Sequence, residues 1–169
     1  MIDPDYCRVM ARYNAWQNRQ LTEALKTVPL AGLKADRGAF FGSILGTLNH
    51  VLWADALWMS RFDPAFDKPV GGIKDSVNLC PTLGMWDAER FALDGRISAW
   101  ADGLSAIRLA GDLSWYSGAK GREQSKPLAL CVVHMFNHQT HHRGQVHAMM
   151  TQAGLNAPVS DLAFMPDKD

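Results

Sequence analysis

Asn137-His138-Gln139-Thr140-His141-His142-Arg143-Gly144-Gln145 is the most informative stretch of this chain. His138 and His142 are four residues apart, so on a helix they lie one turn above the other on the same face. Two imidazoles in that relation can bind one metal ion from one side, as the paired histidines of HExxH helices do. The stretch therefore predicts a helix and, on one face of it, a metal site.

A third ligand for such a site must come from elsewhere in the chain, and His50 is the best candidate. It lies far upstream in Leu48-Asn49-His50-Val51-Leu52-Trp53-Ala54-Asp55. Antiparallel packing of this segment on the later helix would bring His50 opposite the histidine pair. A site of three histidines leaves coordination positions open for water or substrate, which is typical of catalytic metal sites.

Helical phase separates the histidines of the later helix. With about 100° per residue counted from His134, the apolar stripe of this helix is centred near about 100°. His142 falls at about 80° and His138 at about 40°, on or beside the stripe, whereas His134 and His141 lie at its margin. Phase thus favours the pair His138 and His142. The pairs His134 with His138 and His138 with His141 remain alternatives.

Charge and composition exclude several classes of function. The chain has 17 lysines and arginines against 17 aspartates and glutamates, so it offers no basic surface for nucleic acid or anionic lipid. It contains no run of about 18 apolar residues that would span a membrane. The acidic start Met1-Ile2-Asp3-Pro4-Asp5 does not look like a secretory signal. We expect no nucleic-acid partner, no membrane association and a cytoplasmic location.

The cysteines and the chain length indicate a cytosolic protein with a single domain. Cys7, Cys80 and Cys131 are scattered and form no CxxC motif, which indicates reduced thiols in a cytosolic protein. With 169 residues, 47% of them hydrophobic, the chain is long and apolar enough to bury one sizeable core. We therefore predict a single domain over residues 1–169.

Four amphipathic stretches are expected to be helices, with boundaries set by capping residues, proline and glycine. They run from Asp3-Pro4 to about Thr27, from Phe41 or Ser43 to Arg61, from Thr82 to about Gly103, and from Pro127 to about Gln152. Residues 62–81 hold three prolines and two glycines and are predicted to be a long connection. Residues 112–126 are predicted to form a short hairpin.

This pattern predicts an all-α fold, namely a four-helix bundle with a long crossover and a short hairpin before the last helix. Metal sites in such bundles are commonly built from side chains on facing helices. Leu130, Val133 and Phe136 lie away from the main apolar stripe of the last helix. A helix that is apolar on a second side must bury it against something else, and a dimer partner is one candidate.

Several stretches resemble the DinB family, within the wider DinB/YfiT-like superfamily of predicted metalloenzymes. The run 137–145 looks like the family signature, and the similarity covers nearly the whole chain. The other stretches that carry it are Tyr13-Asn14-Ala15-Trp16-Gln17-Asn18, Phe41-Gly42-Ser43-Ile44 followed by Thr47-Leu48-Asn49-His50, and the tail from Gly154-Leu155 through Ser160-Asp161-Leu162.

The resemblance implies a four-helix bundle in an up-down-down-up arrangement, often as a homodimer. It implies a divalent metal bound by three histidines, which map here to His50, His138 and His142. Zinc, nickel and iron all suit imidazole ligands. Relatives in the superfamily are transferases that use low-molecular-weight thiols such as bacillithiol, or mycothiol-dependent isomerases. A thiol cofactor and a small-molecule substrate are therefore expected.

Two further residues are candidates to support the metal ligands. A ligating imidazole normally donates its other N–H to an oxygen, and Asp55, five residues past His50, is one candidate to provide it. Gln145 falls at about 20° on the same helical wheel and could contact a ligand or a bound water. An ion pair between Asp55 and Arg143 is the alternative. Three functions fit these features: a metal-dependent transferase acting with a small thiol, a metal-dependent hydrolase, or a non-enzymatic, dimeric metal-binding protein of the stress response.

Overall fold

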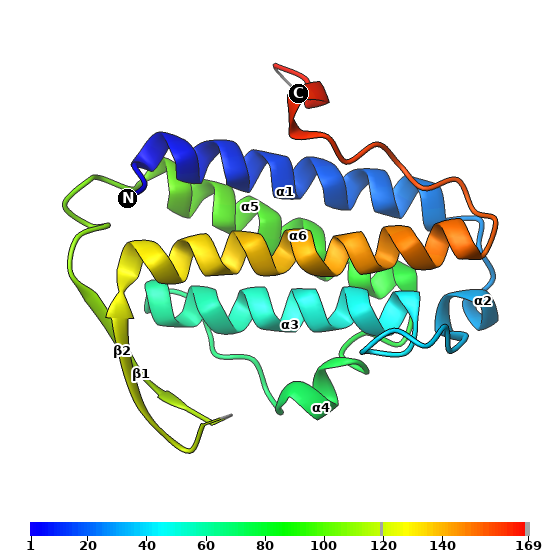
Figure 1. The fold of residues 1–169 in the computed structure, drawn as a ribbon, viewed down its shortest axis with the longest axis horizontal. Helices are drawn as coiled ribbons and strands as arrows, with labels where there is room; N and C mark the ends of the chain where they lie inside the picture. Colours follow the sequence, from blue (N-terminus) through cyan, green and yellow to red (C-terminus); the bar gives the residue numbers. More distant parts are fainter. Residues whose placement is uncertain (119, 168–169) are drawn as a thin grey trace.

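The computed structural model describes residues 1–118 and 120–167, and it is mostly helical (Figure 1). Within those residues it has six α-helices: α1 (Pro4–Leu25), α2 (Leu30–Lys34), α3 (Ile44–Phe62), α4 (Ile73–Ser76), α5 (Leu83–Asp102) and α6 (Leu128–Gln152). Strands β1 (Asp112–Ser117) and β2 (Arg122–Pro127) pair antiparallel into a small hairpin. A short 3-10 helix, Leu162–Phe164, lies in the C-terminal segment.

The long helices begin where the capping residues predict. The side chains of Asp3, Ser43 and Thr82 each accept a hydrogen bond from the backbone N–H three residues later, which satisfies one of the free donors at the start of a helix. After α6, Gly154 adopts a positive φ of 69°, a conformation in which glycine avoids the clash of a Cβ. The predicted starts, the predicted end of α6 and the predicted hairpin are confirmed.

Two short helices interrupt segments that the sequence pattern indicated to be connections. Helix α2 follows Pro29 directly, and α4 lies inside the connection 62–81. A single turn is too short to show a helical repeat, so periodicity could not reveal either of them. The residues after α4 are tied to α3, because the Asn49 side-chain amide donates to the backbone carbonyls of Val77 and Cys80.

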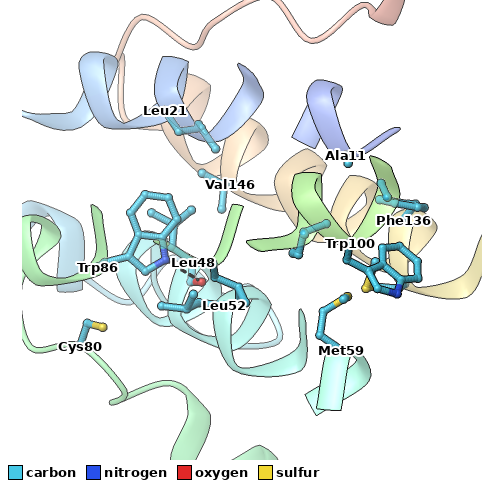
Figure 2. Close-up of a cluster of buried hydrophobic side chains, with 14 of the residues drawn as sticks. Ala11, Leu21, Leu48, Leu52, Met59, Cys80, Trp86, Trp100, Phe136 and Val146 are labelled. Carbon is cyan, nitrogen blue, oxygen red and sulfur yellow. Dashed lines mark hydrogen bonds between the residues drawn. The ribbon is translucent and has the colours of Figure 1, made fainter. Parts of the chain in front are cut away.

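The four long helices pack side by side (Figure 1). Helix α1 packs on α5 and α3 on α6, and α3 also contacts α5. The apolar core lies between them, and in Figure 2 Trp86 of α5 sits beside Leu48 and Leu52 of α3. The Trp86 indole N–H donates to the Leu48 carbonyl at 3.0 Å. Phe136 packs inside the chain against Tyr6 of α1, so this part of the second apolar side of α6 needs no partner.

A buried ionic group joins α3 and α5. The Arg90 guanidinium lies 2.7 Å from Asp55 of α3 and 2.7 Å from Asp94 of its own helix, and all three side chains are buried. Buried charges are tolerated only when they are paired and hydrogen-bonded. The contact therefore holds α5 in one register against α3.

The same network reaches α1 and α6. The side-chain amides of Asn14 and Asn18 of α1 donate to the two oxygens of Asp94, at 2.8 and 2.9 Å. The Arg143 guanidinium of α6 donates in turn to the Asn14 side-chain oxygen. All four long helices are thus connected through polar groups in the interior.

Two smaller findings concern the cysteines and the membrane. Cys7, Cys80 and Cys131 are buried and form no disulfide with one another. Among the described residues, no helix has both the length and the apolar character needed to cross a bilayer.

The buried network gives a prediction about stability. Replacing Asp94 with alanine leaves two asparagine amides without an acceptor and Arg90 with one carboxylate fewer, so the free energy of unfolding should fall by about 3–5 kcal/mol. Urea unfolding followed by circular dichroism measures this change. Asp102→Ala, an exposed position on the same helix, serves as control and should cost no more than about 0.5 kcal/mol. Equal, small effects of both substitutions would contradict the account.

Candidate metal site

Three histidines meet between α3 and α6. A ring nitrogen from each of His50, His138 and His142 lies within 4.8 Å of the other two. The Nε2 atom of His138 is 3.3 Å from Nε2 of His50 and 3.1 Å from Nε2 of His142. These are the three residues that the sequence singled out. The alternative partners His134 and His141 are not part of this group.

The spacing of these nitrogens fits a shared metal ion. An ion with tetrahedral bonds of about 2.0–2.1 Å holds its ligand nitrogens roughly 3.3 Å apart. Three imidazoles whose Nε2 atoms face one another need a proton or a cation between them, because lone pairs at that distance repel. The Nδ1 atom of His138 is buried and has no hydrogen-bond partner among the described residues, so no contact there fixes the protonation of this ring. The donor set therefore suits a divalent metal.

The protonation of His50 follows from its neighbour Ser76. Nδ1 of His50 lies 2.9 Å from Oγ of Ser76, and that hydroxyl donates its only hydrogen to the carbonyl of Ile73 at 2.6 Å. The Ser76 oxygen must therefore accept from His50, which puts the ring hydrogen on Nδ1. The Nε2 lone pair of His50 is left to face the other two histidines, as a metal ligand requires.

Gln145 determines which nitrogen of His142 carries the hydrogen. Its side-chain carbonyl Oε1 lies 2.7 Å from Nδ1 of His142, and a carbonyl oxygen can only accept. His142 thus carries its hydrogen on Nδ1 and presents the lone pair of Nε2 to His138. The amide group of the same glutamine lies 3.4 Å from Nε2 of His141, where it can donate. Gln145, the supporting residue suggested by the sequence, thus contacts His142, and its support of a bound metal stays a prediction.

Burial keeps the clustered histidines neutral. It lowers the pKa of His50 to about 4, with a further contribution from the charge of His142. It lowers the pKa of His138 to about 3, again helped by repulsion from the neighbouring histidines. The pKa of His142 is also lowered by burial. Neutral imidazoles are the form that binds metal, so the site needs little deprotonation at neutral pH.

Phe41 fixes the ring of His50 in place. The two rings stack with centroids 3.7 Å apart and planes 22° from parallel. The Phe41 ring is also 5.3 Å from that of His142, so it covers one side of the cluster. Phe41 and Ser76 both come from segments outside the long helices. Neither residue could be given a role from the sequence, because short or irregular segments show no periodicity.

Asp55 corrects an expectation. It does not contact His50 and it does not pair with Arg143, since its Oδ2 accepts from the Arg90 guanidinium at 2.7 Å and His50 has Ser76 as its partner. Five residues along a helix correspond to a rotation of about 140°, so Asp55 points away from the side of α3 that carries His50. Burial raises the pKa of Asp55 to about 6, and the charge of Arg90 opposes that rise.

Known proteins with a similar sequence or a similar fold belong to the family that the run 137–145 resembles. The family model described as the DinB family matches residues 1–168. The Bacillus subtilis (strain 168) protein named Protein DinB is 23% identical over 171 residues, which cover 93% of this chain and 91% of that protein. The crystal structure of a DinB-like protein from Bacillus cereus ATCC 10987 has a TM-score of 0.66 at 18% identity, over 87% of this chain and 90% of that one.

The hydrogen bond from His142 to Gln145 gives a prediction about metal affinity. Replacing Gln145 with leucine removes the acceptor that fixes the His142 ring, so the affinity for zinc should fall about 10- to 100-fold. Competition with a chromophoric chelator measures the dissociation constant. Asn137→Leu, an exposed position on the same helix, is the matched control and should leave it unchanged. Unaltered affinity in Gln145→Leu would show that the glutamine does not support the site.

Proposed function

The chain belongs to the DinB family, and we propose that it is a metal-dependent transferase acting with a low-molecular-weight thiol. One observation carries the proposal: three neutral imidazole nitrogens from α3 and α6 converge on one point. A tetrahedral ion held by three ligands keeps one position for an exchangeable group. That geometry is typical of catalytic sites rather than structural ones.

The neutral donors determine what a bound metal would contribute. Within the described residues, no aspartate or glutamate belongs to the cluster, so a divalent ion would keep its full positive charge. When bound, the metal would supply the charge that stabilises a thiolate at neutral pH. Ser76 and Gln145 hold two imidazoles in the required orientation, and Phe41 shields the His50 side of the cluster from water. The donor set suits zinc, nickel or iron.

The lack of a carboxylate also favours a thiol over water as nucleophile. A hydrolase gains from a general base that takes a proton from the attacking water. The nearest candidate by sequence, Asp55, is occupied by Arg90. A thiol with a pKa near 8.5 loses its proton far more readily than water does, and needs no such base. These contacts support transfer to a thiol as the reaction.

The reaction we propose is a substitution on a small electrophile. The thiolate sulfur attacks an electrophilic carbon of the substrate, a carbon–sulfur bond forms, and the leaving group departs with the bonding electron pair. The thiol proton goes to solvent. No electrons are exchanged with an outside donor or acceptor, so the step needs no redox cofactor.

Three wider expectations accompany this proposal. The packing of α1, α3, α5 and α6 supports a four-helix bundle in up-down-down-up order. Leu130 is 41% exposed on α6, and a net charge of zero does little to oppose self-association, which supports a homodimer. The free cysteines support a reducing compartment such as the cytoplasm, where a role in the stress response would place the protein.

Thiol-dependent turnover tests the proposed function. The zinc-loaded protein is incubated with 1-chloro-2,4-dinitrobenzene and cysteine, glutathione or bacillithiol, and release of the aryl thioether is followed by absorbance. We expect turnover that needs a thiol and falls at least about 100-fold in His138→Ala, equal to about 2.7 kcal/mol of transition-state stabilisation. His147→Ala, outside the cluster, should behave as the wild type. Activity without thiol would favour a hydrolase, and metal binding without any turnover would favour a non-enzymatic protein.

A further inference from the structure

Arg61 lies on the same side of α3 as His50. The two residues are eleven positions apart, three helical turns, so their side chains leave the helix in nearly the same direction. Side chains on a helix lean towards its N-terminus, and the Arg61 guanidinium carbon lies 4.5 Å from the ring centroid of Trp58, three residues earlier. The positive charge is therefore directed along α3 towards the histidine cluster, with about 12 Å of helix between Trp58 and His50.

The Arg61 guanidinium has aromatic neighbours but no counterion. It is also 5.5 Å from the ring of Trp115 on β1, whose own ring meets Trp58 edge-on at 5.5 Å. It makes no hydrogen bond or ion pair with any part of the chain that the structure describes. The side chain is half-buried, and burial lowers its pKa. None of its nitrogens is among the buried polar atoms that lack a partner, so solvent reaches them and their N–H groups are available to a ligand.

Aromatic rings connect Arg61 with the histidine cluster. The His134 ring lies 5.0 Å from Trp58, edge-on, and 5.8 Å from His138. Figure 1 shows the β1–β2 hairpin, which carries Trp115, at the end of α3 and the start of α6.

A second positive side chain, Lys126, lies in the same region as Arg61. Burial raises the pKa of Cys131, and the charges of both Arg61 and Lys126 oppose that rise.

We propose that Arg61, Trp58, Trp115 and His134 form a subsite for a carboxylate at the far end of the thiol whose sulfur reaches the histidine cluster. This inference rests on the proposed function and specifies its thiol. A guanidinium stacked on indole rings keeps its N–H edges free for two parallel hydrogen bonds to a carboxylate. In a tripeptide of the glutathione type the sulfur is on the middle residue, and the longer γ-glutamyl arm reaches about 10 Å from sulfur to carboxylate. A thiol of that size therefore fits, and free cysteine is too short.

Calorimetric titration of the metal-free protein tests the subsite apart from the metal. The probes are S-methylglutathione, whose sulfur cannot become a thiolate, and its dimethyl ester, which lacks both carboxylate charges. The wild type should bind the acid at least about ten times more tightly than the ester. Arg61→Gln should lose that preference, and Arg61→Lys should keep only part of it because lysine lacks the planar fork.

Two further variants control this experiment. Arg122→Gln removes the same charge from an exposed position on the hairpin and should bind both probes as the wild type does. Trp115→Ala removes a wall of the subsite without altering α3, so it tests the proposal even if Arg61→Gln folds poorly. It should weaken binding of the acid about as much as Arg61→Gln does. Circular dichroism confirms that each variant is folded.

The outcomes separate this inference from the proposed function. Equal binding of acid and ester by the wild type, no binding of the acid, or an unchanged preference in folded Arg61→Gln would each overturn the subsite. A zinc-loaded protein that turns over thiols but fails this test would keep the proposed function and lose the subsite. A protein that prefers the acid through Arg61, yet shows no thiol-dependent turnover, would keep the subsite and lose the proposed function.

Discussion

The buried ionic network around Arg90 sets the geometry on which the rest of the structure depends. Arg90 of α5 pairs with Asp55 of α3 and with Asp94, which reaches Arg143 of α6 through Asn14 of α1. Asp55 shares α3 with His50, and Arg143 adjoins His142 on α6. A buried charge pair tolerates little displacement, since separating its members leaves an uncompensated charge in the interior. The network therefore holds α3 and α6 in the register that brings the three candidate ligands together.

Within that frame, the site depends on partners that determine which nitrogen of each ring carries the hydrogen. Ser76 and Gln145 accept hydrogen bonds from the Nδ1–H groups of His50 and His142, so the Nε2 lone pairs of both rings face inward. Burial keeps the rings neutral by lowering their pKa values. The cluster is thus ready to bind a cation without first losing protons. Arg61 lies three turns further along α3, and we propose its guanidinium as a second point of attachment for a thiol at the cluster.

The sequence predicted what helical geometry controls. The four-residue spacing and the phase of His138 and His142 placed both on one face. Asp3 and Thr82 marked two helix starts, and a third was expected at Phe41 or Ser43 and lies at Ser43. Contacts between segments far apart in the chain could not be predicted from the sequence. Ser76 reaches His50 from a one-turn helix that has no periodicity, and Phe41 does so from a loop. Asp55 was misjudged because closeness in sequence was taken for closeness in space, although five residues turn a helix by about 140°.

Metal content tests the central claim most directly. The protein should be purified without an affinity tag and its bound metals measured by inductively coupled plasma mass spectrometry, alongside His50→Ala, His142→Ala and the control His147→Ala. The account predicts about one divalent metal per chain in the wild type and the control, and none in the two cluster variants. No metal in the wild type, or metal retained in both cluster variants, would contradict it and leave these histidines as structural residues between α3 and α6.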